Sequence, residues 1–142
     1  MSSSYEKPIQ LGLCCLNTQL RSNKPTIFCS RTMIVKSINE KGVEELQEKI
    51  KNNLEDLIKM IEWNERNGIR VLRISSQLFP HKSNPKIDNY TFEFAIPLLK
   101  KIGETYKKYN HRLTFHPGQY NVLGTKDPLK LEQTINDLEY HA

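Results

Sequence analysis

Three short segments of the chain have the hydrophobic pattern of strands that are buried in a parallel sheet. They are the nearly continuous apolar run 11–16 (LGLCCL) and the alternating segments 69–75 (IRVLRIS) and 112–116 (RLTFH). Toward the ends of the two alternating segments, Leu72 and Ile74, and likewise Leu113 and Phe115, alternate with polar residues, and alternate side chains of a strand face opposite sides of a sheet. The face opposite these apolar residues carries Arg73, Ser75, Thr114 and His116. The pattern therefore predicts three strands, two of which have one apolar and one polar face.

Helical periodicity fills the intervals between these strands. Apolar residues recur every three or four positions over 43–67, which predicts a long helix that ends at an Asn-Gly pair. A second helix is predicted over 92–109, and a third begins after Asp127, an N-cap residue that is followed by Pro128. The residues predicted on the inner side of the third helix are Leu131, Ile135 and Leu138.

Two segments outside these elements carry no periodic pattern. Residues 1–10 contain three serines and a proline and predict a disordered leader. The connection 18–41 is long for a compact domain, and connections of that length are usually functional or disordered. Residues 11–142 are therefore expected to form the folded domain.

The order of the predicted elements, β-α-β-α-β-α, indicates a parallel sheet with helices packed on its outside. A doubly wound sheet needs apolar residues on both faces, whereas polar residues near the strand ends of one face are typical of a barrel mouth. The pattern favours an α/β fold built from the parallel βα units of a TIM-type (β/α)8 barrel. About the first three units of such a barrel fit within 11–142.

Composition describes a globular and modestly basic chain. It has 142 residues, 37% hydrophobic content and a formal charge of +5, which suits either a polyanionic partner or a merely solvated surface. Cys14, Cys15 and Cys29 form no CxxC pair, and neighbouring residues of a strand point to opposite faces, so free thiols that share no metal are expected. The absence of a signal peptide, a lipidation motif and a long apolar run predicts an intracellular protein, cytoplasmic or nuclear, without membrane contact.

Candidate chemistry gathers where the predicted strands end. His116 stands at the end of the third strand, directly before Pro117, and the carboxyl ends of parallel strands are where catalytic and ligand-binding residues collect. A metal ligand or general base at this position competes with a surface histidine before a turn. The loop after the second strand brings His81 and Asn84 toward the same mouth, although His81 also fits a solvated loop and Asn84 a turn.

The motifs LGLCCLN, NLEDLIKMIEWNERNGIRVLRISSQLFPHKSNP and RLTFHPGQY resemble, in order and spacing, the amino-terminal part of the ultraviolet damage endonuclease family. This resemblance implies a (β/α)8 barrel that nicks DNA immediately 5′ to ultraviolet photoproducts by metal-dependent phosphodiester hydrolysis. It also implies a cluster of divalent ions, Mn²⁺ foremost, with Mg²⁺, Co²⁺ and Zn²⁺ as the other candidates. Damaged double-stranded DNA is the expected partner.

The resemblance assigns roles to individual positions. His116 matches a metal-binding histidine, Gln119 and Tyr120 match a pair that probes the duplex opposite the lesion, and Asn17 matches a residue lining the damage pocket. A flat ring such as that of tyrosine can replace a displaced base in the stack, and an amide can pair with an orphaned one. Arg73, on the polar face of the second strand, is a further candidate for DNA contact.

Three departures from the family pattern limit this assignment. Asn84 stands where the family has a metal-binding histidine, which His81 would have to replace, and Leu13 stands where the family has an aromatic residue. The family's remaining ligands lie on later strands that these residues do not include. No catalytic residue beyond metal ligands is therefore predicted, and the chain is expected to be inactive by itself.

Two other functions remain compatible with the sequence. One is a non-catalytic DNA-binding remnant, and the other is a different metal-dependent TIM-barrel enzyme, of the abasic-site endonuclease or sugar isomerase type. A sheet of three strands also leaves an unpaired edge and an uncovered inner face. We therefore expect self-association or a second chain that completes the barrel.

Overall fold

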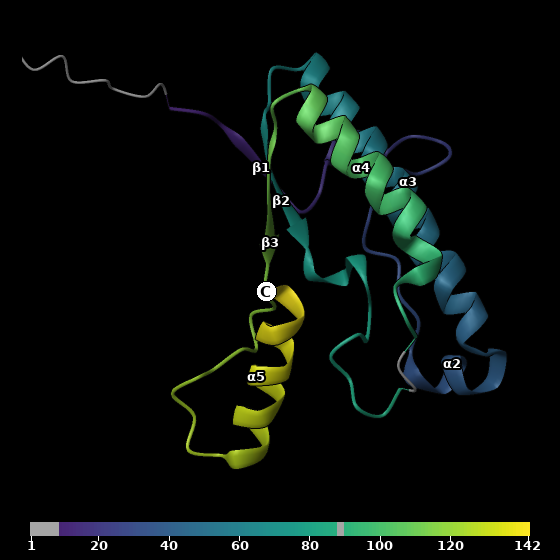
Figure 1. The fold of residues 1–142 in the computed structure, drawn as a ribbon, viewed down its shortest axis with the longest axis vertical. Helices are drawn as coiled ribbons and strands as arrows, with labels where there is room; N and C mark the ends of the chain where they lie inside the picture. The colour runs from purple at the N-terminus through teal and green to yellow at the C-terminus, as the bar shows by residue number, and fades with distance from the viewer. Residues whose placement is uncertain (1–8, 88–89) are drawn as a thin grey trace, which may run out of the picture.

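The computed structural model describes residues 9–87 and 90–142, and it contains one parallel sheet with helices on one of its faces (Figure 1). The strands are β1 (Gly12–Cys14), β2 (Val71–Ser75) and β3 (Arg112–His116), in the order β1-β2-β3. Both strand pairs are parallel. The predicted α/β fold with three parallel strands is confirmed.

Two helices cover the apolar face of this sheet. They are α3 (Val43–Arg66) and α4 (Ile96–Lys108), the latter preceded by the 3-10 turn η2 (Glu93–Ala95). Figure 1 shows both running along the same side of the strands. Leu72 and Ile74 of β2 are buried beneath them, as the alternation predicts. The core is completed by residues that α3 presents at helical spacing: Leu46, Ile50, Leu54, Leu57 and Ile61.

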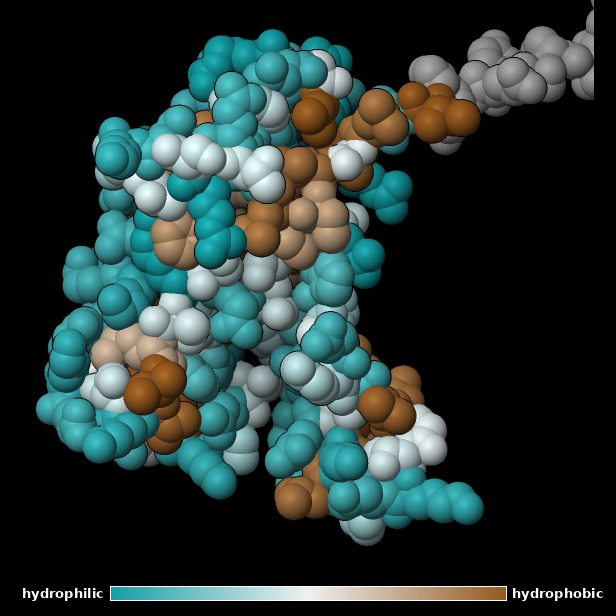
Figure 2. Space-filling model, turned by 180° about the vertical axis from the view of Figure 1, so that it is seen from behind, coloured by the Kyte–Doolittle hydropathy of each residue, from teal (hydrophilic) through white to brown (hydrophobic). Residues whose placement is uncertain are grey.

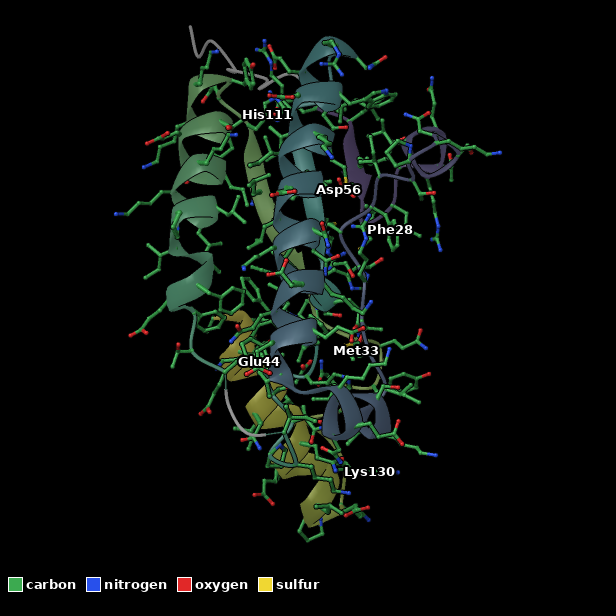
Figure 3. All side chains as sticks on the ribbon, turned by 90° about the vertical axis from the view of Figure 1, so that its right-hand side faces the viewer. Phe28, Met33, Glu44, Asp56, His111 and Lys130 are labelled. Carbon is green, nitrogen blue, oxygen red and sulfur yellow. The ribbon has the colours of Figure 1, made fainter. Side chains whose placement is uncertain are left out.

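The connection predicted to lack regular structure contains two short helices, α1 (Thr18–Arg21) and α2 (Val35–Lys41). Polar residues of α3 hold the segment between them. Asp56 accepts hydrogen bonds from the backbone N–H of Phe28 (3.2 Å) and from the Arg31 guanidinium (2.7 Å). In Figure 3 the labelled Asp56 lies on the side of α3 that faces Phe28. The connection is therefore an ordered part of the domain in the residues that the structure describes.

The third helix, α5 (Pro128–His141), begins where the sequence predicts, with Asp127 as its N-cap. It does not lie against the outer face of the sheet: Figure 1 shows it beyond the carboxyl ends of the strands. The predicted inner side is wrong for Ile135, which is 42% exposed, whereas Leu131 and Leu138 are half-buried and Thr134 is the buried residue of the helix. This helix contacts the sheet through Tyr140 and His141, which pack on Phe115, and not through its predicted apolar stripe.

The surface that is seen from behind is partly apolar (Figure 2). In the view from behind, apolar residues gather near the beginning of the described chain and again around α5 and its preceding loop (Figure 2). The exposed residues in these regions include Ile9, Leu11, Leu123 and Leu129. The predicted leader, 1–10, falls almost wholly outside the described residues. Among the described residues, no helix has the length and apolar character needed to cross a membrane.

Candidate functional site

The candidate site is the polar face of the sheet at the carboxyl ends of its strands. The register pairs Arg73 with Thr114 and Ser75 with His116, which puts these four side chains on the face opposite the buried Leu72 and Ile74. Cys14 of β1 is in register with Arg73 and joins the same face. The polar face predicted from the strand pattern is thus present, with a thiol added from the first strand.

The structure brings one group of potential metal donors together within its described part: Cys14, Cys15 and His116. The two sulfurs and a ring nitrogen of the histidine all lie within 4.8 Å of one another, and the sulfurs are 3.7 Å apart. The expectation that Cys14 and Cys15 point to opposite faces is therefore wrong. Cys15 follows the last residue of β1 and has a φ of 58°. A tight turn, in which Leu16 N–H donates to Cys14 O (2.6 Å), ends the strand's alternation at this point.

His116 has a defined tautomer in this arrangement. Its Nδ1 makes a hydrogen bond to the carbonyl oxygen of Pro117 (2.8 Å), and a carbonyl can only accept, so Nδ1 carries the proton. In the neutral ring Nε2 then has the free lone pair. A histidine held in this way by a backbone carbonyl is typical of metal-binding sites.

Burial raises the pKa of two thiols, those of Cys15 and Cys29. Burial, together with the hydrogen bond to Cys14, raises the pKa of Cys15 to about 11. Burial likewise raises the pKa of Cys29 to about 11, although backbone hydrogen bonds lower it in part. Near neutral pH these groups are therefore poor nucleophiles, and Cys15 becomes a thiolate there only if a cation displaces its proton.

Gln119 and Tyr120 lie in the loop between β3 and α5, beside a depression of about 520 Å³. Tyr120 is 85% exposed, which is unusual for so large a ring. Ser76 and Gln77, in the turn η1 (Ser76–Leu78) after β2, also line this depression. Lys130 of α5 adds a positive charge to the lining, and Asp137 of the same helix adds a negative one. The loop thus offers an aromatic ring and an amide beside a polar hollow that is lined by one positive and one negative side chain.

Hydrogen bonds to α5 hold this loop in place. Asn121 Nδ2 donates to Asp137 Oδ2 (2.6 Å) and to the carbonyl oxygen of Gly118 (3.1 Å). The backbone N–H of Val122 donates to Thr134 Oγ1 (3.1 Å). Asp137 Oδ1 also accepts from Ser83 Oγ (3.1 Å), so one carboxylate joins the loops that follow β2 and β3. Sequence reasoning missed Asp137, because a carboxylate on an amphipathic helix carries no signal of its partners.

Asn17 is buried at the end of the first strand, where it caps α1. Its Oδ1 accepts a hydrogen bond from the backbone N–H of Leu20 (3.0 Å), while its Nδ2 has no hydrogen-bond partner among the described residues. The capping role therefore gives a hydrogen-bond partner to the oxygen of this amide but not to its nitrogen. Its part in lining a damage pocket stays a prediction.

His81 and Asn84 are engaged in local contacts after β2. A ring nitrogen of His81 hydrogen-bonds the carbonyl oxygen of Met33, and Asn84 Oδ1 accepts from the backbone N–H of Lys86 (3.0 Å). The second contact is that of a turn. Neither residue joins the donor group of His116 in the described part of the chain. Metal binding by either therefore stays a prediction without support from the geometry.

Arg73 and Leu13 occupy opposite faces of the sheet. Arg73 is exposed on the polar face, in register with Thr114, where its charge is accessible to an anion. Leu13 pairs with Leu72 and packs against the core under the helices. Leu13, where the resemblance leads us to expect an aromatic residue, thus serves the core, and DNA contact by Arg73 stays a prediction.

Known proteins match this chain over the same residues that form its fold. The family model described as UV-endonuclease UvdE matches residues 9–142. The chain belongs to this family. It is 44% identical over 145 residues to the UV-damage endonuclease of Schizosaccharomyces pombe and 38% identical over 160 residues to that of Neurospora crassa. These alignments cover 99% and 93% of this chain but 24% of each relative, so the chain spans about a quarter of their length.

A solved structure gives the same result for the fold. The UvdE chain matches the crystal structure of SacUVDE with a TM-score of 0.82 and 28% sequence identity. The match covers 94% of this chain and 44% of that one. The three strands and their helices are therefore the corresponding part of a UvdE TIM barrel, as predicted.

The donors in this part of the barrel do not fit a manganese cluster. Mn²⁺ prefers carboxylate, carbonyl and water ligands, whereas the group formed within the described residues contains two thiols, one imidazole and no carboxylate. Thiolates with imidazole instead suit Zn²⁺ and similar ions. The donor group formed within the described residues therefore does not support a manganese ion at this position.

Proposed function

We propose that this UvdE chain serves in DNA repair, within the cell, as the lesion-recognising part of an endonuclease that nicks DNA 5′ to ultraviolet photoproducts. The observation that carries the proposal is the exposure of Tyr120 beside Gln119 on an anchored loop at the carboxyl ends of the strands. A damaged base is cheaper to unstack than an intact one, and an exposed ring can fill the space that it leaves. Family membership supports DNA as the substrate.

The geometry suits recognition because the loop is held before DNA arrives. Asn121 and Val122 hydrogen-bond Asp137 and Thr134 of α5, so little ordering remains to be done when the ring enters a duplex. Lys130 lines the adjoining hollow, and Arg73 is exposed on the nearby sheet face. Both can contact phosphates, which position a duplex without reading its sequence.

Binding to DNA with and without a lesion tests this proposal. Fluorescence anisotropy would compare a duplex containing one photoproduct with the identical undamaged duplex, in the presence of a chelator. Tyr120→Ala should reduce the preference for damage by about 1–3 kcal/mol, the usual contribution of one stacked base, and Tyr120→Phe should retain it. Leu123→Ala is the matched control, because this exposed neighbour lies outside the lining of the hollow. Equal binding of both duplexes by the unmodified chain would contradict the proposal.

Hydrolysis is not expected from these residues alone. In the described part of the chain His116 is joined by thiols and by no carboxylate, so the donors needed to activate water are incomplete. Irradiated plasmid incubated with the chain and Mn²⁺ should therefore remain supercoiled. Preferential nicking of the irradiated plasmid would show that the chain is a complete nuclease.

The proposal also requires more protein at the open face of the sheet. The side opposite α3 and α4 carries Arg73, Thr114 and His116 beside exposed apolar residues, and an uncovered strand edge is prone to pairing. Self-association or a separate chain that completes the barrel would cover it. Light scattering coupled to gel filtration distinguishes a dimer from a monomer. A compact monomer that stays soluble at high concentration would contradict self-association.

A further inference from the structure

Cys14, Cys15 and His116 form a group with the dimensions of a tetrahedral metal site. The Sγ atoms of the cysteines are 3.7 Å apart. Two thiolates bound to one tetrahedral zinc ion at about 2.3 Å would lie about 3.8 Å apart. The sulfur atoms are much farther apart than the roughly 2.05 Å of a disulfide bond. The separation of the two sulfur atoms thus matches that of two thiol ligands of one ion.

The backbone brings these donors together from separate strands. Cys14 ends β1 and Cys15 turns back at a φ of 58°, while His116 ends β3 on the far side of β2. All three ligand atoms still lie within 4.8 Å of one another. The three ligand atoms must move somewhat closer together to share one ion. Rotation about the χ1 bonds of these side chains can supply that movement.

The surroundings of His116 agree with a ligand role. Nδ1 is occupied by the carbonyl oxygen of Pro117, so the lone pair of Nε2 is free for a cation. Hydrogen bonding of the second ring nitrogen to a carbonyl is the usual way in which a protein orients a metal-binding histidine. This contact is independent of the cysteine geometry.

We propose that Cys14, Cys15 and His116 bind a thiophilic divalent cation of the Zn²⁺ class. Thiolate ligands select Zn²⁺ over Mn²⁺, and three protein ligands leave one position of a tetrahedral ion open. Cys14 is exposed, so water or a phosphate oxygen can reach that position. The inference goes beyond the proposed DNA function, since it concerns a cation that binds without DNA.

Titration with Co²⁺ tests this site, because cobalt replaces zinc and its spectrum reports the ligands. The folded 142-residue chain, kept reduced by a phosphine, should bind one equivalent. The intense visible bands of tetrahedral cobalt should appear together with a sulfur-to-cobalt charge-transfer band in the ultraviolet. Zn²⁺ should abolish both signals at stoichiometric amounts, and Mn²⁺ in excess should not.

Single substitutions identify the donors. Cys14→Ser and Cys15→Ser should each weaken the charge-transfer band and lower the affinity by at least about tenfold, since changes in outer-shell partners alone cost that much. His116→Ala should lower the affinity similarly while the sulfur band remains. Cys29→Ala is the matched control: this third cysteine is buried and lies outside the group, so its loss should change neither signal. Circular dichroism of each variant verifies that the chain is folded.

Three outcomes would overturn the inference. They are no cobalt binding by the reduced, folded chain, binding without a sulfur band, and a band unchanged in both Cys14→Ser and Cys15→Ser. None of these measurements contains DNA. The cobalt titration and the DNA-binding assay therefore test the two proposals separately, and a negative result in one does not contradict the other.

Discussion

At the scale of single residues, two buried polar side chains of α3 organise the loops around the sheet. Asn53 accepts from the backbone N–H of Arg31 (2.8 Å) and donates to the carbonyl oxygens of Arg31, Gln77 and Leu78. Asp56 accepts from Arg31 and Lys59 and from the backbone of Phe28. Both side chains belong to a helix whose apolar stripe gives the core. Their partners lie in the connection, which therefore folds as part of the domain.

Replacing Asp56 by asparagine should destabilise the chain by about 1–3 kcal/mol, because the partly buried donors of Arg31 and Phe28 lose a charged acceptor. Burial raises the pKa of Asp56, but the hydrogen bonds from Lys59, Arg31 and Phe28 outweigh it and leave the pKa below the ordinary 3.8. The stabilisation is therefore complete above the unfolded-state pKa and is lost as pH falls through the lower folded value.

Urea unfolding at several pH values measures this difference. The difference in free energy of unfolding between the unmodified chain and Asp56→Asn should be constant above about pH 5 and should become smaller in more acid solution. Glu55→Gln, a change at the exposed neighbouring position, is the control and should be nearly neutral. If this difference in free energy became larger on acidification, folding would not lower the pKa of Asp56.

At the scale of elements, α5 acts as a support for the loop that carries Gln119 and Tyr120. The helix begins with the Asp127 cap, whose Oδ1 accepts from the backbone N–H groups of Leu129 (3.0 Å) and Lys130 (3.4 Å). Its last turn packs Tyr140 and His141 against Phe115 of β3. Tyr140 also hydrogen-bonds the backbone of Ser76 and Phe79. The helix is thus tied to the exits of two strands.

Loss of the α5 cap should weaken this helix specifically. Asp127→Ala should cost about 1 kcal/mol, because two amide donors lose their acceptor. Hydrogen exchange should accelerate at Leu129 and Lys130 and leave the amides of α3 unchanged. Lys126→Ala, beside the cap, should change neither. Equal acceleration throughout the domain would show that α5 unfolds only with the core.

Removal of the carboxylate that joins the two loops should release Tyr120. Asp137→Ala deprives Asn121 and Ser83 of their shared acceptor, so exchange at the Val122 amide should rise and discrimination of damaged DNA should fall. Glu139→Ala provides the control on the exposed side of the same helix. Unaltered exchange and discrimination in Asp137→Ala would mean that the loop is held by other contacts.

At the scale of the whole molecule, helices cover one face of the sheet, and polar groups lie at the carboxyl ends of its strands. A second polar cluster lies at the opposite end of the strands, where His111 Nε2 contacts Glu65 Oε2 (2.8 Å) and Arg70 contacts the same carboxylate. Hydrogen bonds from Arg70 and then from His111 hold the pKa of Glu65 below its usual value. Figure 3 shows His111 far from Lys130 on α5. Amino-end clusters in barrels serve stability, which separates this group from the candidate site.

This one-sided arrangement predicts a gradient of protection across the sheet. β2 lies between two strands and beneath α3 and α4, whereas β1 has three residues and a single partner. Native-state hydrogen exchange should therefore be slowest at Leu72 and Ile74 and faster at the amides of β1. Comparable protection of β1 and β2 would indicate that the edge and open face are covered in solution.

The sequence by itself determined the elements that depend on local pattern. The long helix 43–67, the cap at Asp127 and the polar face with Arg73 and His116 follow from periods of 3.6 and 2 residues, and these periods reflect backbone geometry. Resemblance between short motifs was enough to identify the family, because the order and spacing of these motifs are properties of the chain.

Only the tertiary structure decided which side chains meet. The turn at Cys15 sets two neighbouring thiols side by side and near His116, against the alternation of the strand. Asp137 meets Ser83, 54 residues away, and thereby links the loop of Tyr120 to the exit of β2. Such contacts depend on positive φ angles and on packing between distant segments, which a local periodicity does not encode.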